Sequence, residues 1–175
     1  MQVWDAATGQ TIITYRDHQA PVSSAVWSQD SKLIASGGYG ATVRVWHANT
    51  GTLVLIYRGH SDGIFGLAWS PDGQKIASAS FDTTAQVWDA TTGEHAVIYR
   101  GHSNWVTKVA WSPDSTTIAS GSTDKTVQLW QASTGTHVFT YYGHTDYVTG
   151  IAWSPDGWHI ASASIDHTVQ VWQAK

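Results

Sequence analysis

Three sets of a serine, a histidine and an aspartate recur along the 175-residue sequence, and these are the residue types of a hydrolase triad. In such a triad the aspartate orients the histidine, which takes the serine proton and turns the hydroxyl into a nucleophile. The three sets have the same internal spacing. They are His60, Ser78 and Asp82; His102, Ser120 and Asp124; and His144, Ser162 and Asp166.

The regular spacing of the three sets favours a structural role over catalysis. A catalytic site needs an oxyanion hole and a cleft, whereas equally spaced copies indicate a repeated building unit. We interpret each set as a buried hydrogen-bond chain, in which aspartate accepts from histidine, histidine meets the serine hydroxyl, and the serine oxygen accepts from an indole N–H. The indoles belong to Trp88, Trp130 and Trp172. We therefore expect no enzymatic activity, no catalytic residue, and no metal or cofactor site.

The choice of Ser78 over Ser80 depends on hairpin geometry. A turn centred near residue 83 would put Ser78 opposite Trp88 and so direct its hydroxyl to the indole. The same position is Ser120 or Ser162 in the later sets.

An incomplete fourth set lies near the N-terminus. It keeps His18, Ser36 and Trp46, but Gly40 stands where the other sets have aspartate. Hydrogen bonds to charged groups contribute about 1.5–3 kcal/mol. We therefore expect this part of the chain to be the least stable.

The sets recur because the whole chain is repetitive, with a Val-Trp or Leu-Trp pair every 42 residues. Such a period means that each repeat is one supersecondary unit that buries its apolar surface against its neighbours. The predicted repeats are residues 3–44, 45–86, 87–128 and 129–170, within a single domain over residues 1–175.

Each repeat predicts four short strands rather than helices. In the first one, residues 22–27, 33–36 and 42–46 are rich in β-branched and aromatic residues and are separated by turn-forming residues. Residues 126–130 show the two-residue alternation of a strand. Residues 11–16 (TIITYR) predict one further strand near the N-terminus.

The landmarks of this unit resemble the WD40 repeat, which has Gly-His near its start and Trp-Asp near its end. They are Gly59-His60 with Trp88-Asp89, Gly101-His102 with Trp130-Gln131, and Gly143-His144 with Trp172-Gln173. The resemblance covers nearly the whole chain and implies a β-propeller with four blades per chain, each of four antiparallel strands. It also implies that the His, Ser, Asp and Trp sets are structural tetrads. Asp17 departs from the family pattern, in which glycine precedes the histidine.

Four blades are too few for an ordinary WD40 ring of about seven or eight. The C-terminal repeat has three strands, and residues 1–16 supply the strand that would complete a last blade. We therefore expect a homodimer that forms an eight-bladed propeller, against the alternatives of a four-bladed monomer or a fragment of a longer array. The Gln-Val-Trp segment occurs both at 2–4 and at 170–172. Only one copy can pair at each seam, and we expect the C-terminal one, with residues 1–4 frayed or packed elsewhere.

The composition is not typical of a protein that binds nucleic acid or spans a membrane. The net charge is −4, with 9 Lys and Arg against 13 Asp and Glu, so the basic footprint of a nucleic-acid binder is missing. No apolar run approaches the roughly 18 residues of a membrane helix. There is no Cys to form disulfides. We expect a soluble, cytoplasmic protein.

Residues that differ between repeats are the candidate contacts for a protein partner. In this family the loops between blades and the turns within them form one rim, and aromatic residues are enriched at interface hot spots. These residues could instead simply cap neighbouring blades. The candidates are Tyr39, Phe81, Trp105, Lys108, Lys125, Tyr147 and His167.

The sequence thus favours a self-assembling protein-interaction scaffold with an unidentified protein partner. One alternative is a structural, excised or engineered repeat segment without a dedicated ligand. A second is glycan or small-molecule binding at the rim aromatics.

Overall fold

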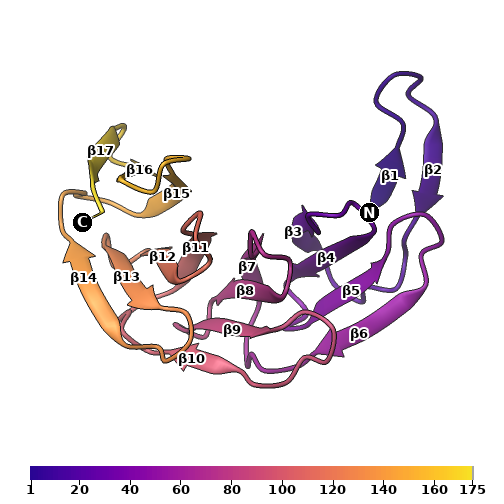
Figure 1. Cartoon of the computed structure of the whole chain (residues 1–175), viewed down its shortest axis with the longest axis horizontal. Helices are drawn as coiled ribbons and strands as arrows, with labels where there is room; N and C mark the ends of the chain where they lie inside the picture. Colours follow the sequence, from indigo (N-terminus) through magenta and orange to yellow (C-terminus); the bar gives the residue numbers. More distant parts are fainter. Residues whose placement is uncertain (175) are drawn as a thin grey trace.

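The chain folds entirely into β-strands joined by turns. The structure is a computed structural model that describes residues 1–174. Within that range 17 strands form antiparallel sheets that follow one another along an open arc (Figure 1). The prediction of an all-β fold with four-stranded sheets in successive repeats is confirmed.

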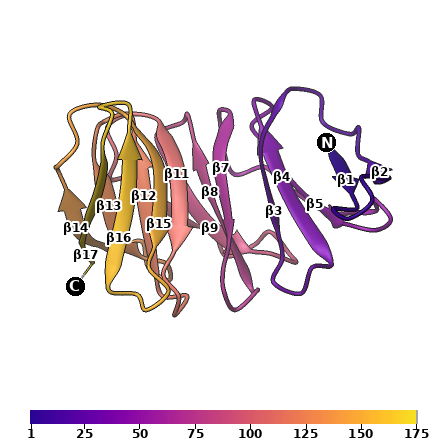
Figure 2. The same cartoon turned by 90° about the horizontal axis from the view of Figure 1, so that it is seen from above.

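Three four-stranded sheets, here called blades 1 to 3, form the middle of the arc. Seen from above, they stand side by side (Figure 2). Blade 1 consists of β3 (Val22–Trp27), β4 (Leu33–Gly38), β5 (Val43–His47) and β6 (Leu53–Tyr57). Blade 2 consists of β7 (Ile64–Trp69), β8 (Lys75–Ser80), β9 (Ala85–Asp89) and β10 (Val97–Tyr99). Blade 3 consists of β11 (Val106–Trp111), β12 (Thr117–Ser122), β13 (Val127–Gln131) and β14 (His137–Tyr141).

The two ends of the arc carry smaller sheets. Blade 4 has three strands, β15 (Val148–Trp153), β16 (His159–Ser164) and β17 (Val169–Gln173). The N-terminal hairpin consists of β1 (Gln2–Trp4) and β2 (Thr11–Thr14). The two sheets face each other across the open side of the arc (Figure 1).

Residues 2–4 form a strand in the single chain, and the expectation that they are frayed or packed elsewhere in the assembled ring stays a prediction. They pair with β2 in a sheet that, within residues 1–174, consists of these two strands. Any further neighbour of β2 would have to come from outside this sheet. The N-terminal hairpin is held to blade 1 by a cluster of Val3, Tyr15, Ile34 and Trp46.

Tight hairpins connect the inner strands of each blade. In blade 2 the carboxylate of Asp72 accepts hydrogen bonds from Ser70 Oγ (2.6 Å) and from the backbone N–H of Gln74 (3.0 Å). Gly73 lies between them at φ +75°, and Ser115 takes the same position in blade 3 at φ +60°. The Asp-Gly and Asp-Ser pairs thus form these turns, because they tolerate the left-handed backbone that the hairpin needs.

The core lies between blades rather than within one. Val43 and Val45 on β5 are fully buried in a cluster with Ile64, Leu67 and Trp69 of blade 2. Burying a side chain of this kind stabilises the fold by about 1.5–3 kcal/mol. Each blade is therefore stabilised by the neighbour that covers its face.

Hydrogen bonds reinforce the contact between blades. Thr107 Oγ1 donates to the carbonyl of Val148 in the next blade (2.5 Å), and Ser23 Oγ donates to that of Ile64 in the same way (2.5 Å). The indole of Trp111 donates backwards to Ala68 of the preceding blade (3.1 Å). Neighbouring blades are thus held in a fixed position by polar as well as apolar contacts.

Candidate functional site

In blade 3 the four side chains of the predicted tetrad form a continuous chain of hydrogen bonds. His102 Nδ1 lies 2.8 Å from Asp124 Oδ2, and its Nε2 lies 2.8 Å from Ser120 Oγ. The indole of Trp130 donates to the same hydroxyl oxygen at 3.1 Å. The chain links the loop before β11 to β12 and β13.

The same connections recur in blades 2 and 4. In blade 2 they join His60 to Asp82 (2.7 Å) and Ser78 (2.8 Å), with Trp88 donating to Ser78 at 3.2 Å. In blade 4 they join His144 to Asp166 (2.8 Å) and Ser162 (2.7 Å), with Trp172 donating at 3.4 Å.

The partners fix the direction of each proton. The carboxylate can only accept, so histidine Nδ1 carries a proton and donates it. The indole can only donate, so the serine oxygen accepts from it, which leaves the serine proton for histidine Nε2 or, in blades 2 and 3, for the more distant backbone carbonyl of Gln86 (3.4 Å) or Gln128 (3.3 Å). This tautomer and orientation match a triad ready to act, but Ser78 and Ser120 are 0% exposed and Ser162 is 1% exposed. No substrate reaches these hydroxyls, and the arrangement serves to satisfy buried polar groups.

The register of the β8–β9 hairpin differs by one residue from the predicted one. Ser78 lies opposite Gln86, and Ile76 lies opposite Trp88, so the hairpin is centred on residue 82 rather than 83. The Trp88 indole reaches the Ser78 hydroxyl diagonally across the strands. A difference of one residue in the turn centre was enough to change the predicted pairing.

Hydrogen bonds hold the tetrad aspartates in their charged form. Burial of Asp124 opposes ionisation, but the hydrogen bond and charge of His102 and the bonds from Thr126 outweigh it and lower the pKa of Asp124 to about 2. The pKa of Asp82 is lowered as well, against burial, by His60 and Thr84. These carboxylates are therefore charged at neutral pH.

A second buried bond, which the sequence analysis missed, joins successive blades. Tyr99 Oη donates to Gln128 Oε1 at 2.6 Å, and its ring stacks on Trp130 with centroids 4.8 Å apart. Burial raises the pKa of Tyr99 to about 12, so the phenol stays a donor. The pairs Tyr57–Gln86 and Tyr141–Gln170 repeat the bond at 2.5 and 2.6 Å. The recurrence of Tyr and Gln at the 42-residue period was the signal available in the sequence.

This bond explains why glycine precedes the tetrad histidine. A Cβ at Gly101 would collide with the hydroxyl of Tyr99 and lie 2.5 Å from Gln128 Oε1. The glycine makes room for the phenol.

Blade 1 replaces this arrangement by an ion pair. Asp17 stands at the glycine position and Arg44 at the glutamine position, with Arg44 Nη1 3.3 Å from Asp17 Oδ2. Tyr15 Oη is 3.5 Å from the same carboxylate oxygen. The two substitutions compensate each other, because a side chain at position 17 takes the space where the phenol and the glutamine meet in the other blades.

The tetrad of blade 1 lacks its carboxylate, as the sequence indicated. His18 Nε2 is 2.8 Å from Ser36 Oγ, and Trp46 donates to that oxygen at 3.3 Å. Burial, and then the charges of Arg44 and the N-terminus, lower the pKa of His18, with Asp17 opposing in part. A Cβ at Gly40 would have only Ala20 Cβ nearby, at 3.5 Å. Gly40 is not among the residues with positive φ, so the site has both the space and the backbone for an aspartate.

The predicted rim residues form an aromatic row across three blades. Phe81 of blade 2 packs against Trp105 before blade 3 (centroids 4.6 Å apart) and against Tyr39 of blade 1 (5.9 Å). Phe65 on β7 extends the row, 4.5 Å from Phe81. Tyr39 is 57% exposed and Trp105 48% exposed. These rings therefore cap neighbouring blades and still present surface to a partner.

The other candidates differ in accessibility. Tyr147, Lys125 and His167 are exposed, whereas Lys108 is half-buried on β11. Lys125 and His167 also take the left-handed backbone of their turns, at φ +74° and +68°. The residue types at these two positions did not predict this backbone constraint.

Within residues 1–174, no three His, Cys, Asp or Glu side chains gather as ligands of a metal ion. No helix in that range is long and apolar enough to cross a membrane.

Comparison with protein families matches the chain four times to the WD domain, G-beta repeat (WD40). The matches cover residues 9–47, 51–89, 93–131 and 135–173, and confirm the resemblance inferred from the repeats. Comparison with curated proteins gave no match.

Proposed function

Because the chain belongs to the WD40-repeat family, we propose that it is a non-enzymatic, cytoplasmic interaction scaffold whose ring is completed by a second copy of itself. WD40 repeats generally serve as protein-interaction scaffolds, and their binding surfaces depend on a rigid ring.

The observation that supports assembly is the exposed face of β17. Val169 and Val171 are 69% and 67% exposed, whereas the equivalent Val127 and Leu129 on β13 are 0% and 1% exposed. Blade 4 covers the β13 residues, but within residues 1–174 nothing covers their counterparts on β17. Exposed apolar patches of this kind indicate an interaction surface.

The other end of the arc presents the complementary face. Val22, Ala25 and Trp27 on β3 stand where Ile64, Leu67 and Trp69 stand on β7, and Trp27 is 49% exposed against 7% for Trp69. In blade 2 those β7 residues cover the valines of β5. We therefore assign β3 of a second copy as the cover for β17.

Polar groups at the ends fit the same occupant. Thr107 Oγ1 donates to the carbonyls of Gly121 and Val148, the second of which lies in the next blade. The equivalent Thr149 is exposed, and among residues 1–174 its hydroxyl is bonded only to Ala163 O, at 3.4 Å. In a ring of two copies its second acceptor is the carbonyl of Val22 from the other copy. Two such seams close eight blades with twofold symmetry.

Measurement of solution mass tests the assembly. We expect the mass of two 19.0-kDa chains for the unaltered protein and of one chain for Val171→Arg, because the arginine would be buried without a partner. Val138→Arg is the matched control, since Val138 is also half exposed but lies on the outer strand β14. A mass of one chain for the unaltered protein contradicts the proposal.

The aromatic row is the proposed contact for a protein partner. Tyr39 and Trp105 combine large exposed rings with positions fixed by packing on Phe81, which lowers the entropic cost of binding. A pull-down with Trp105→Ala and Tyr39→Ala should lose the partner while the mass stays that of two chains. Retention of every captured protein by this double variant would exclude the rim as the contact.

A further inference from the structure

The N-terminal hairpin has the geometry of the outer half of a complete blade. Gln2 pairs with Thr14, Val3 with Ile13 and Trp4 with Thr11, and the register shifts between Val3 and Trp4. In blade 3, Gln128, Leu129 and Trp130 pair with Thr140, Phe139 and His137, and the shift falls at the same place. β1 and β2 are therefore equivalent to the third and fourth strands of a blade.

This half blade is already docked on blade 1 as a complete blade would be. Tyr15 stacks on Trp46 with centroids 4.6 Å apart and an interplanar angle of 3°. Tyr57 stacks on Trp88 in the same way between blades 1 and 2, at 4.3 Å and 9°. β2 thus occupies its place in the ring before any second copy arrives.

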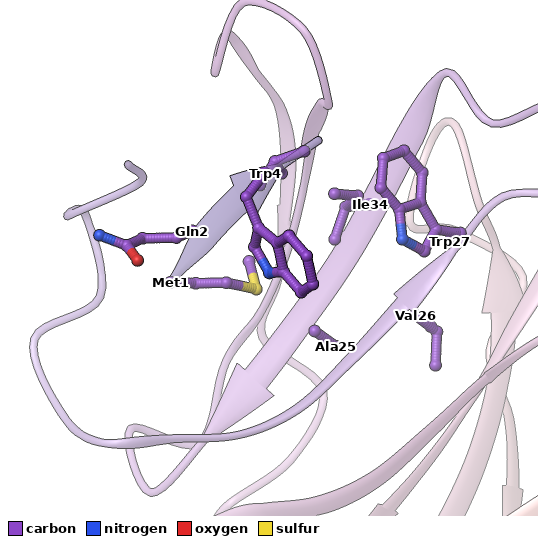
Figure 3. A pocket seen from close by; sticks show the side chains of 8 residues that line it. Met1, Gln2, Trp4, Ala25, Val26, Trp27 and Ile34 are labelled. Carbon is purple, nitrogen blue, oxygen red and sulfur yellow. The ribbon is translucent and has the colours of Figure 1, made fainter. Parts of the chain in front are cut away.

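The single chain has no inner strands beside β1 and β2 within residues 1–174, and an apolar cavity lies next to the place where they would stand. A space of about 300 Å³ is lined by Met1, Trp4, Ala25, Trp27 and Ile34, among others, and lies between β1 and the strands β3 and β4 (Figure 3). Inside the arc the equivalent space is filled, because β4 lies against β7 and β12 against β15. In the proposed ring β16 of the second copy lies against β3 in this space.

Two strands then compete for one position. Next to β2 the ring has room for a single third strand, and both β1 and β17 of the second copy carry Gln-Val-Trp. Ser162 already accepts a hydrogen bond from the indole of Trp172, whereas Trp4 is 59% exposed and, in the described part of the chain, its indole donates to no serine. β17 pairs over five residues with β16, against three for β1 with β2. These differences favour β17.

We propose that β1 covers the edge of β2 only in the free chain and is displaced by β17 of a second copy during assembly. This inference rests on the proposed two-copy ring and specifies its seam. Gln170 takes the place of Gln2 opposite Thr14, so β2 exchanges an identical neighbour within its own chain for one from the other chain. The N-terminal segment thereby acts as a removable cap on the assembly surface.

A disulfide that locks β1 onto β2 tests the displacement. The side chains of Gln2 and Thr14 are in contact (Nε2 to Oγ1 3.4 Å), and the chain has no cysteine of its own, so Gln2→Cys with Thr14→Cys introduces one defined bridge. The bridge is formed in dilute solution before the protein is concentrated, and the reduced form of the same variant is the control.

We expect the mass of two chains for the reduced variant and of one chain for the oxidised variant. If the oxidised variant also has the mass of two chains, β1 stays on β2 in the ring and the displacement is wrong while the assembly stands. If the reduced variant and the unaltered protein both have the mass of one chain, the assembly itself fails and the displacement with it.

A second pair of variants detects the exchanged neighbour directly. Thr14→Cys with Gln170→Cys should give a covalent two-chain species on non-reducing electrophoresis. Thr14→Cys with Gln128→Cys is the matched control, because Gln128 is the same residue in a buried internal strand whose neighbour is Thr140. Absence of the two-chain species in the first variant, in a sample with the mass of two chains, overturns the proposal.

Discussion

Tyr15 stacks face to face on Trp46, and its hydroxyl lies 3.5 Å from the carboxylate of Asp17. Tyr99 makes the same stack on Trp130 but donates a 2.6 Å hydrogen bond to buried Gln128. The ring contact is thus shared by these blades, whereas the phenol bond is not.

Tyr99→Phe should therefore cost about 1–2 kcal/mol, because Gln128 Oε1 loses its donor in a buried place. Tyr15→Phe should change the free energy of unfolding by less than about 0.5 kcal/mol. Urea denaturation of the two variants measures the difference. Equal losses would show that the hydroxyl of Tyr15 is as important as that of Tyr99.

Gly40→Asp should complete the tetrad of blade 1 and stabilise the protein by about 1–2 kcal/mol. His18 and Thr42 are in place to bind the new carboxylate, as His60 and Thr84 bind Asp82. The melting temperature should rise, and the pKa of His18, which is lowered now, should increase. Gly40→Asn is the uncharged control and should move the His18 pKa less; a lower melting temperature for the aspartate variant would contradict the prediction.

The protein should lose stability as the pH falls from about 4 to about 2. The pKa of Asp124 is about 2 in the folded chain, below its ordinary value of 3.8, so its contribution is present above the ordinary value and is lost as the pH falls through the folded one. Asp124→Asn should lower stability at pH 7 and flatten this acid dependence, as chemical denaturation at several pH values can measure. An unchanged slope in the variant would show that other carboxylates dominate.

Thr83→Gly should raise the free energy of unfolding by up to about 1 kcal/mol, because a β-branched residue there is held at φ +68°. Gln29→Gly is the control: Gln29 is exposed in a turn without positive φ, and glycine there should destabilise the chain. Thermal unfolding compares the two, and a loss of stability in Thr83→Gly would show that its side chain contributes more than the strain costs.

Much of this fold follows from the 42-residue period, because a strand predicted in one repeat is also predicted at the equivalent position of the other three. The strand predicted at residues 22–27 coincides with β3, and the four side chains predicted for each tetrad meet through hydrogen bonds. The error in the hairpin centre near residue 82 arose because spacing alone does not define a turn.

The exchange of Gly and Gln for Asp17 and Arg44 could not be anticipated in the same way. Asp17 stood out in the sequence as a departure, but its link to Arg44 depends on a collision between a Cβ and a phenol that only coordinates reveal. The pairing of β1 with β2 likewise depends on which other strand is available to β2.

The bond from Thr107 to Val148 joins residues only 41 positions apart, as does the one from Ser23 to Ile64. Contacts between blades thus connect each repeat to the repeat that precedes it in the sequence. Folding can begin in any unit and extend to its neighbour, without waiting for distant parts of the chain. During synthesis each blade can settle on its predecessor as soon as its own 42 residues have left the ribosome.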